Sequence, residues 1–178
     1  ALEFVPSEGG ALLLDDPVAK EEDRQKNELT VVVSAGPTHE PIDPVRFVGN
    51  RPSGRQGFAL APAALDLGAR VILVAGPTSL PTPAGAERVD VATASEMHRA
   101  VLAASAKADA LVMAAAVADY RPKRVAGRKI KKDEAVPEVT LESTPDILAE
   151  VGKRKERRIL IGFAAETEDL VANARKKL

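Results

Sequence analysis

The chain has 178 residues, 45% of them hydrophobic, so it is long and apolar enough to form one domain around a core. Its net charge of −1 gives no general electrostatic attraction to nucleic acid or to an anionic membrane. The sequence has no cysteine and only two histidines, which excludes disulfides and thiolate chemistry and argues against a histidine-rich metal site.

No apolar run approaches the roughly 18 to 20 residues that a membrane helix needs, and the first residues lack the features of a signal peptide. We therefore expect a cytoplasmic protein with no membrane and no nucleic-acid partner. Residues 1–28 are rich in charge and proline, and the run KEEDRQKNE is more typical of a linker than of a core helix. We expect a linker there and one folded domain over residues 29–178.

Strands are predicted where short apolar or β-branched runs stand between breaker residues. The expected strands are Leu29–Ser34, Arg70–Ala75, Glu87–Val91, Asp109–Ala114 and Arg158–Phe163, and Val136–Leu141 alternates well enough for an edge strand.

Helices are predicted between these strands from their caps and apolar patterns. They are Gly54–Gly68 after an N-cap at Ser53, Ser95–Ala106 capped by Ser95, Pro145–Val151 capped by Thr144, and a last helix over Glu168–Leu178. Pro62 should kink the first helix or mark a tolerated restart. Pro145 fits the first position of its helix because its missing donor costs nothing there.

Strands that alternate with helices predict an α/β fold: a doubly wound, mostly parallel, Rossmann-like sheet with helices on both faces. Because the chain stops inside the last expected helix, we expect the domain to be incomplete at its C-terminus.

Three loops leave the carboxyl ends of predicted strands, and in a doubly wound sheet such loops meet at one crevice. They are Ala35–Pro52, Ala115–Arg124 and Ala164–Thr167. The first is far longer than the usual strand-to-helix link of about two to six residues, which favours a ligand site.

The helix that follows the first loop has an anion-binding pattern at its start. Ser53, Gly54 and Gly57 offer backbone N–H groups and a hydroxyl at a helix N-terminus. The pattern is not a Walker A loop, since Arg55-Gln56 stands where Lys-Ser/Thr is required, and GxGxxG is also missing. The alternative is a capped helix after an irregular loop, with no ligand.

The second loop supplies small residues, a carboxylate and positive charge. Ala114–Ala116 would let a flat ring lie against the backbone, and Asp119 is placed to accept ribose hydroxyls or to hold a metal. The lysines of KIKK, with Arg124 and Arg128, could form a flap over a triphosphate and stabilise a leaving pyrophosphate. The alternative is a solvated loop.

Other polar residues of the first loop are open to two interpretations. Asp43 and Arg46 either form an internal pair that shapes the loop, or Arg46 binds substrate. Asn50, with an uncharged donor and acceptor, suits the orientation of a carbonyl or a tetrahedral adduct. His39 and His98 are not expected to be catalytic.

Six motifs, in this order, resemble those of the bacterial phosphopantothenoylcysteine synthetases: SAGPTHEPIDPVRFVGNRPSGRQGFALA, LVAGPTSLPTP, AAAVADYRP, KIKK, TPDIL and GFAAET. The resemblance runs from about Thr30 to Leu178. That domain is usually the C-terminal half of a bifunctional coenzyme A biosynthesis protein whose N-terminal half is a flavin-dependent decarboxylase. The resemblance therefore implies that residues 1–28 are the linker or a remnant of the decarboxylase half, and that FMN belongs to that half alone.

The resemblance implies a ligase that joins 4′-phosphopantothenate to L-cysteine with CTP and Mg²⁺, through an acyl-cytidylate intermediate and as a homodimer. Asn50 matches the asparagine that converts this intermediate to product, and Lys129 matches the flap lysine that contacts the triphosphate. The nucleotide-binding positions implied are Ser53, Gly54, Gly57, Ala115, Ala116, Asp119, Lys129, Glu142, Ser143, Thr144, Pro145, Phe163 and Lys177. Arg46 and Asn50 are the expected substrate-binding residues, and the metal ligands are not assigned.

Two departures from the family pattern are visible. The usual Ser-Ser-Gly-Lys is here Pro52-Ser53-Gly54-Arg55, which keeps a positive charge but removes one hydroxyl. The family has a further lysine about one helical turn beyond Lys177, and this chain ends before it.

Two other functions remain as alternatives. A nicotinamide-dependent oxidoreductase would need an acidic residue after the second strand to bind ribose, and VILVAGPT supplies none. A non-catalytic nucleotide-binding assembly domain is the third possibility.

Overall fold

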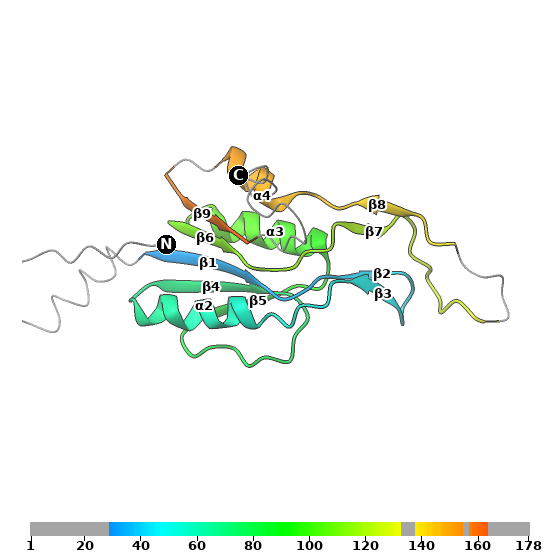
Figure 1. Cartoon of the computed structure of the whole chain (residues 1–178), viewed down its shortest axis with the longest axis horizontal. Helices are drawn as coiled ribbons and strands as arrows, with labels where there is room; N and C mark the ends of the chain where they lie inside the picture. Colours follow the sequence, from blue (N-terminus) through cyan, green and yellow to red (C-terminus); the bar gives the residue numbers. More distant parts are fainter. Residues whose placement is uncertain (1–28, 133–137, 155–156, 164–178) are drawn as a thin grey trace, which may run out of the picture.

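The computed structural model describes residues 29–132, 138–154 and 157–163, and its centre is a five-stranded parallel sheet (Figure 1). The strand order is β5-β4-β1-β6-β9. These strands span Glu87–Asp90 (β5), Arg70–Ala75 (β4), Thr30–Ala35 (β1), Ala110–Met113 (β6) and Ile159–Gly162 (β9), and every pairing between them is parallel. The predicted α/β, Rossmann-like sheet is confirmed, and all five central strands lie where the sequence predicts them.

Helices cover both faces of the sheet, as predicted. Helix α2 (Arg55–Asp66) lies on one side, and α3 (Ala94–Ser105) and α4 (Ile147–Lys153) lie on the other (Figure 1). A hydrophobic core lies on each face of the sheet, and neighbouring residues of β1 pack into different cores. Val33 packs on the α2 side and Val32 on the α3 side, and both are fully buried. A strand buried on both faces needs the continuous β-branched run found here rather than alternation.

The first turn of α2 depends on glycine rather than on a capping side chain. The N-cap is Gly54, not Ser53, and it has a left-handed φ of 79° with no side-chain capping bond. The Ser53 hydroxyl lies 3.5 Å from the N–H of Arg55. The helix continues through Pro62, so this proline does not end it.

The other two predicted caps are also displaced. Thr93, not Ser95, caps α3, because its side chain accepts from the Glu96 N–H at 3.2 Å while the Glu96 carboxylate accepts from the Thr93 N–H. This reciprocal capping box satisfies two free donors at once, which a single serine cannot do.

Asp146, not Thr144, caps α4. Its carboxylate accepts from the Ala149 N–H at 2.9 Å, and Pro145 therefore precedes the helix. The Thr144 hydroxyl donates instead to the carbonyl of Ala118 at 2.6 Å.

Two antiparallel hairpins extend beyond the carboxyl ends of the central strands (Figure 1). One joins β2 (His39–Pro41) to β3 (Phe47–Gly49), and the other joins β7 (Tyr120–Pro122) to β8 (Leu141–Ser143). The sequence predicts neither β2, β3 nor β7. The expected edge strand Val136–Leu141 is misplaced: residues 138–140 are not a strand, and β8 starts at Leu141, where it can pair with β7.

Several expectations lie outside the described residues. These are the linker over residues 1–28, residues 133–137, the loop 164–167, the helix Glu168–Leu178 and Lys177. Within the described part, no helix has the length and apolar character needed to span a bilayer.

The capping box of α3 predicts an acid-dependent part of the stability. The backbone N–H groups of Ala92 and Thr93 lower the pKa of the Glu96 carboxyl below its ordinary value of 4.5. A lowered folded-state pKa stabilises the fold above pH 4.5, and this contribution is lost as the pH falls through the lowered value.

We expect Glu96→Gln to reduce the loss of stability between about pH 7 and about pH 3.5, because the amide cannot titrate. Urea midpoints of both proteins at the two pH values measure this difference. An equal acid-induced loss in both proteins would show that the Glu96 carboxylate does not contribute it.

Candidate active site

A cavity of about 600 Å³ lies at the carboxyl ends of β6 and β9. Four segments form its wall: the end of the first loop with the start of α2, the loop after β6, the turn before α4, and the end of β9. The lining residues are Asn50, Pro52, Gln56, Met113–Asp119, Thr144–Leu148, Gly162 and Phe163. The crevice outside the carboxyl ends of parallel strands is the usual ligand site of such sheets.

The cavity brings together seven of the candidate site residues: Asn50, Ala115, Ala116, Asp119, Thr144, Pro145 and Phe163. They come from segments that lie far apart in the sequence, from Asn50 to Phe163. Seven others among the described candidates do not line it: Arg46, Ser53, Gly54, Gly57, Lys129, Glu142 and Ser143.

The lining also includes residues that the sequence reasoning did not single out. They are Pro52, Gln56, Met113, Val117, Ala118, Asp146, Ile147, Leu148 and Gly162. Their positions at element ends could have indicated them, since Met113 ends β6, Asp146 caps α4 and Ile147 begins it. Ala114, one of the small residues expected to face a flat ring, also lines the cavity.

Side chains from other segments fix the course of the loop after β6. The Ala115 N–H donates to the Ser34 hydroxyl at 3.2 Å, and the Ala118 N–H donates to the Thr38 hydroxyl at 3.0 Å. Thr144 donates to the Ala118 carbonyl from the opposite side. The loop therefore presents small alanines to the cavity on a backbone that is held in place.

Asn50 reaches across the cavity to the same loop. Its Nδ2 donates to the carbonyl oxygens of Ala116, at 3.3 Å, and Val117, at 3.1 Å. This contact joins two loops that are 66 residues apart in the sequence.

The glycines of the expected anion cradle have a packing role. A Cβ atom on Gly57 would lie 2.5 Å from the Ala35 Cβ, and one on Gly54 would lie 3.1 Å from the Gly36 Cα. Both glycines are buried and bring the first turn of α2 against the end of β1. The N-terminus of α2, with its free N–H groups, thus lies at the end of the sheet that carries the cavity, and Gln56 lines it.

Glu142 is part of an ion-pair network beside a second cavity of about 320 Å³. Its carboxylate accepts from Arg121 Nε at 2.8 Å, and Arg121 Nη1 donates to the Ser95 hydroxyl at 2.8 Å. These contacts tie the hairpin β7–β8 to the start of α3.

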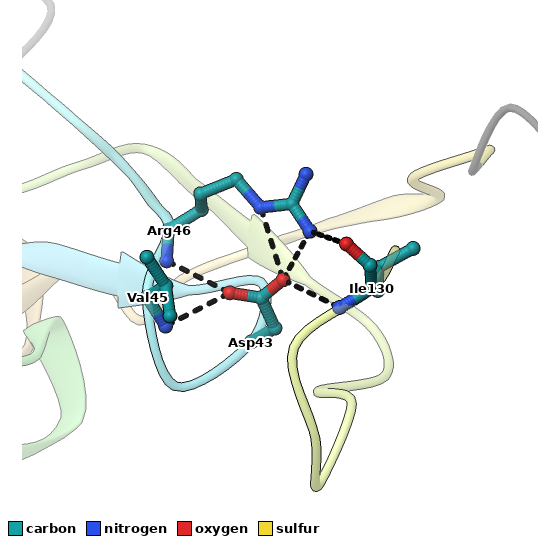
Figure 2. A network of polar contacts seen from close by, with 4 residues as sticks. All are labelled: Asp43, Val45, Arg46 and Ile130. Atoms are coloured by element: carbon teal, nitrogen blue, oxygen red, sulfur yellow. Dashed lines mark hydrogen bonds and ion pairs between the residues drawn. The ribbon is translucent and has the colours of Figure 1, made fainter. Parts of the chain in front are cut away.

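Asp43 and Arg46 form the internal pair that was one of the two interpretations (Figure 2). The Asp43 side chain is fully buried, whereas 45% of the Arg46 side chain is exposed. The Arg46 guanidinium holds the pKa of the Asp43 carboxyl well below its usual range, against the opposing effect of burial, and the N–H groups of Val45, Ile130 and Arg46 add to the shift.

The described residues contain no group of three or more His, Asp or Glu side chains that could hold a metal ion. Asp119 and Asp146 are the cavity carboxylates, and the Asp146 side chain is already engaged as the cap of α4. This donor set suits Mg²⁺ only in its usual form at phosphate sites, with one or two carboxylates and the remaining ligands from phosphate and water.

Comparisons with known proteins agree with the fold. Residues 26–178 match the family described as "DNA/pantothenate metabolism flavoprotein C-terminal domain". The chain is 51% identical over 149 residues to the coenzyme A biosynthesis bifunctional protein CoaBC of Bacillus subtilis (strain 168), a match that covers 83% of this chain and 37% of that protein. It is 48% identical over 153 residues to the CoaBC protein of Escherichia coli (strain K12), covering 84% of this chain and 38% of that protein.

Among solved structures, the crystal structure of the C-terminal domain of CoaBC matches with a TM-score of 0.74 and 45% identity, covering 84% of this chain and 71% of that chain. The chain thus spans less than two-fifths of the length of these curated relatives. On its matched residues, the chain belongs to the family of DNA/pantothenate metabolism flavoprotein C-terminal domains.

Proposed function

We propose that this domain is a phosphopantothenate–cysteine ligase that uses CTP and acts in coenzyme A biosynthesis in the cytoplasm. The relatives named above are coenzyme A biosynthesis proteins. The observation that carries the proposal is the cavity of about 600 Å³ that Asn50, the alanine loop after β6 and the turn before α4 line together.

The cavity suits a nucleotide in size and chemistry. Its volume lies within the range of about 300 to 1,000 Å³ that small-molecule sites occupy. Ala115 and Ala116 leave room for a flat base, and Phe163, with 48% of its surface exposed at the rim, offers a ring for stacking. Selection of cytosine would come from backbone donors and acceptors of the loop after β6.

The first chemical step is the activation of the acid. A carboxylate oxygen of 4′-phosphopantothenate attacks the α-phosphorus of CTP and forms a P–O bond. The P–O bond from the α-phosphorus to the oxygen that bridges to the β-phosphate breaks, and pyrophosphate leaves with its negative charge. Lys129, on the flap, and the N-terminus of α2 would stabilise that charge. Mg²⁺, when bound with the nucleotide, would neutralise further phosphate charge, with Asp119 as its cavity carboxylate.

The second step forms the amide. The cysteine amine attacks the acyl carbon of the acyl-cytidylate, the C–O bond to phosphate breaks, CMP leaves, and the amine loses a proton. Asn50 would orient the reacting groups at the rim of the cavity. Arg46, whose side chain is 45% exposed, would bind the substrate.

Two further partners belong to this proposal. Exposed apolar side chains on the hairpins, including Phe47, Tyr120 and Leu141, favour a homodimer in which these surfaces are covered. The names of the curated relatives describe bifunctional proteins, which supports a fused, FMN-dependent decarboxylase domain in the full-length protein.

The test follows the two half-reactions separately. We expect pyrophosphate release that requires CTP, Mg²⁺ and 4′-phosphopantothenate but not L-cysteine, and amide formation only after L-cysteine is added. ATP and NADH serve as comparison nucleotides, each with and without Mg²⁺. Stabilisation by NADH alone, or pyrophosphate release that does not depend on 4′-phosphopantothenate, would refute the proposal.

A further inference from the structure

A buried carboxylate joins two segments of the chain that lie 87 residues apart (Figure 2). Asp43 lies in the turn between β2 and β3, and its partner Ile130 lies in the segment that carries the flap lysines. The Asp43 side chain has no exposed surface. A carboxylate is costly to bury unless its oxygens are fully hydrogen-bonded, so its partners explain why it is there.

One carboxylate oxygen closes the turn. Asp43 Oδ1 accepts from the N–H groups of Val45 and Arg46, both at 2.9 Å. The Arg46 carbonyl accepts in return from Ile42 at 2.8 Å and from Asp43 at 3.3 Å. These local bonds are typical of an Asp that starts a turn, and a serine can form their weaker equivalents.

The other oxygen faces the flap segment. Asp43 Oδ2 accepts from Arg46 Nε at 3.0 Å, from Arg46 Nη2, and from the Ile130 N–H at 3.2 Å. Arg46 Nη2 also donates to the Ile130 carbonyl at 2.9 Å. The Asp43–Arg46 pair therefore binds both the donor and the acceptor of one residue, which fixes the backbone of Ile130 in position and in orientation.

The two joined segments lead to Lys129 and Asn50. The proposed function assigns Lys129 to the activation step and Asn50 to amide formation. Ile130 directly follows Lys129, and the turn leads through β3 to Asn50, four residues after Arg46. A second bond, from the Ala126 N–H to the Ile42 carbonyl at 2.9 Å, ties the same segments together.

We propose that Asp43 is a positioning residue that fixes the Lys129 segment relative to the strand leading to Asn50, so that the residues of the two proposed steps keep a fixed relation to each other. The expected effect of Asp43 on the reaction rate rests on the proposed function. The expected effect of Asp43 on the position of the Lys129 segment does not. Asp43 itself has no contact with the reacting groups in this account.

The chemistry requires a carboxylate here rather than an amide. Five N–H donors point at Asp43, two at Oδ1 and three at Oδ2. An asparagine has one acceptor oxygen, so either orientation of its amide places an NH₂ group against other donors. Asp43→Asn therefore removes the connection with almost no change in volume.

The test compares Asp43→Asn with Asp90→Asn in the full-length protein. Asp90 is a matched control because it also accepts from an arginine, Arg88 at 2.7 Å, but its side chain is 71% exposed and lies at the end of β5. Hydrogen–deuterium exchange of peptides that cover residues 124–132 reports on the Ile130 N–H without any ligand. We expect exchange there to become roughly tenfold to a hundredfold faster in Asp43→Asn and to stay unchanged in Asp90→Asn.

The kinetic arm measures CTP-dependent pyrophosphate release. We expect kcat to fall by about tenfold to a hundredfold in Asp43→Asn because Lys129 is displaced, while the KM for 4′-phosphopantothenate stays near the wild-type value. General loss of folded protein would instead lower the active fraction and speed exchange throughout the domain.

Asp43→Ser separates the flap contact from the stability of the turn. Its hydroxyl can accept from Val45 and Arg46 but is too short to reach Ile130, so this variant tests the connection even where Asp43→Asn does not fold. We expect the same faster exchange at Ile130 and the same fall in kcat.

Unchanged exchange at Ile130, or faster exchange with unchanged pyrophosphate release, would overturn the assignment. A wild-type protein without ligase activity would refute the proposed function instead, and the exchange comparison would still decide whether Asp43 fixes this segment.

Discussion

Asn50→Ala is expected to retain pyrophosphate release but to lower amide formation by about 10²- to 10³-fold, so that the acyl-cytidylate accumulates. The size of the effect is that of removing one preorganised polar group from a reacting centre. The reason lies in the bonds that already hold this side chain at the rim of the cavity.

The orientation of the Asn50 amide is determined by its neighbours. Nδ2 donates to the carbonyls of Ala116 and Val117, and the reverse orientation would place Oδ1 against two carbonyl oxygens. Within the described part of the chain, no hydrogen bond engages Oδ1. Under the proposed function, this oxygen would accept from the incoming cysteine amine, and that contact would act only in the second half-reaction.

This prediction is checked by measuring the two half-reactions of Asn50→Ala separately. Pyrophosphate release reports on the first, and quenched-flow detection of the acyl-cytidylate reports on the second. Gln56→Ala is a useful comparison, because it truncates another amide that lines the same cavity at the start of α2. We expect Gln56→Ala to change both half-reactions together. A normal rate of amide formation by Asn50→Ala would remove this side chain from the mechanism.

The second large effect is expected from Gly76→Ala, at the carboxyl end of β4. A Cβ atom there would lie 1.8 Å from the Pro37 carbonyl oxygen and 2.9 Å from the Pro37 carbonyl carbon. Both are backbone atoms, so no side-chain rotation can relieve the overlap. We expect a loss of roughly 3 kcal/mol in the free energy of unfolding, or a fall of about 10 °C in Tm.

The steric overlap at Gly76 would also displace a residue of the candidate active site. Pro37 forms a parallel bridge with Ala116, and the Ala116 N–H donates to the Gly36 carbonyl at 2.9 Å. Moving Pro37 away from a new methyl group would therefore displace Ala116, which lines the cavity. We expect weaker binding of CTP in the fraction of Gly76→Ala that remains folded.

Gly127→Ala is the matched control for this substitution. Nothing lies within 4 Å of its added Cβ, and its φ is not in the left-handed region. Calorimetric Tm values of the two variants, with and without CTP, measure both effects. Equal Tm values for Gly76→Ala and Gly127→Ala would contradict the close packing of Gly76 on Pro37.

The helix caps show where local sequence reasoning fails. Ser95 and Thr144 are good capping residues by type, yet the caps are Thr93 and Asp146. At both helices, two residues that could act as the cap lie two positions apart, and hydrogen bonds determine which of them does. The Glu96 carboxylate accepts from the Thr93 N–H and so completes the capping box at Thr93. The Thr144 hydroxyl donates to the Ala118 carbonyl in a distant loop instead of capping α4.

For this chain, the amino-acid sequence by itself determined the central sheet and the family. Residues 31–33 of β1 and 71–75 of β4 are continuous apolar runs, and burial on both faces of a sheet is the ordinary outcome for such runs. The sequence predicts both ends of β4 correctly. The six motifs were sufficient to predict a resemblance that the matched residues 26–178 then supported.

Only the tertiary structure decided which polar residues meet. Strands β7 and β8 have three residues each, too few to show the alternation of apolar and polar residues that predicts a strand. They form because they pair with each other, with Tyr120 opposite Ser143. Gly57 is predicted to bind an anion because its backbone N–H lies at a helix N-terminus, but the absence of a side chain also lets Ala35 pack against it. The partner of Asp43 is the backbone N–H of Ile130, and a backbone donor has no signature in the sequence because every residue except proline carries one.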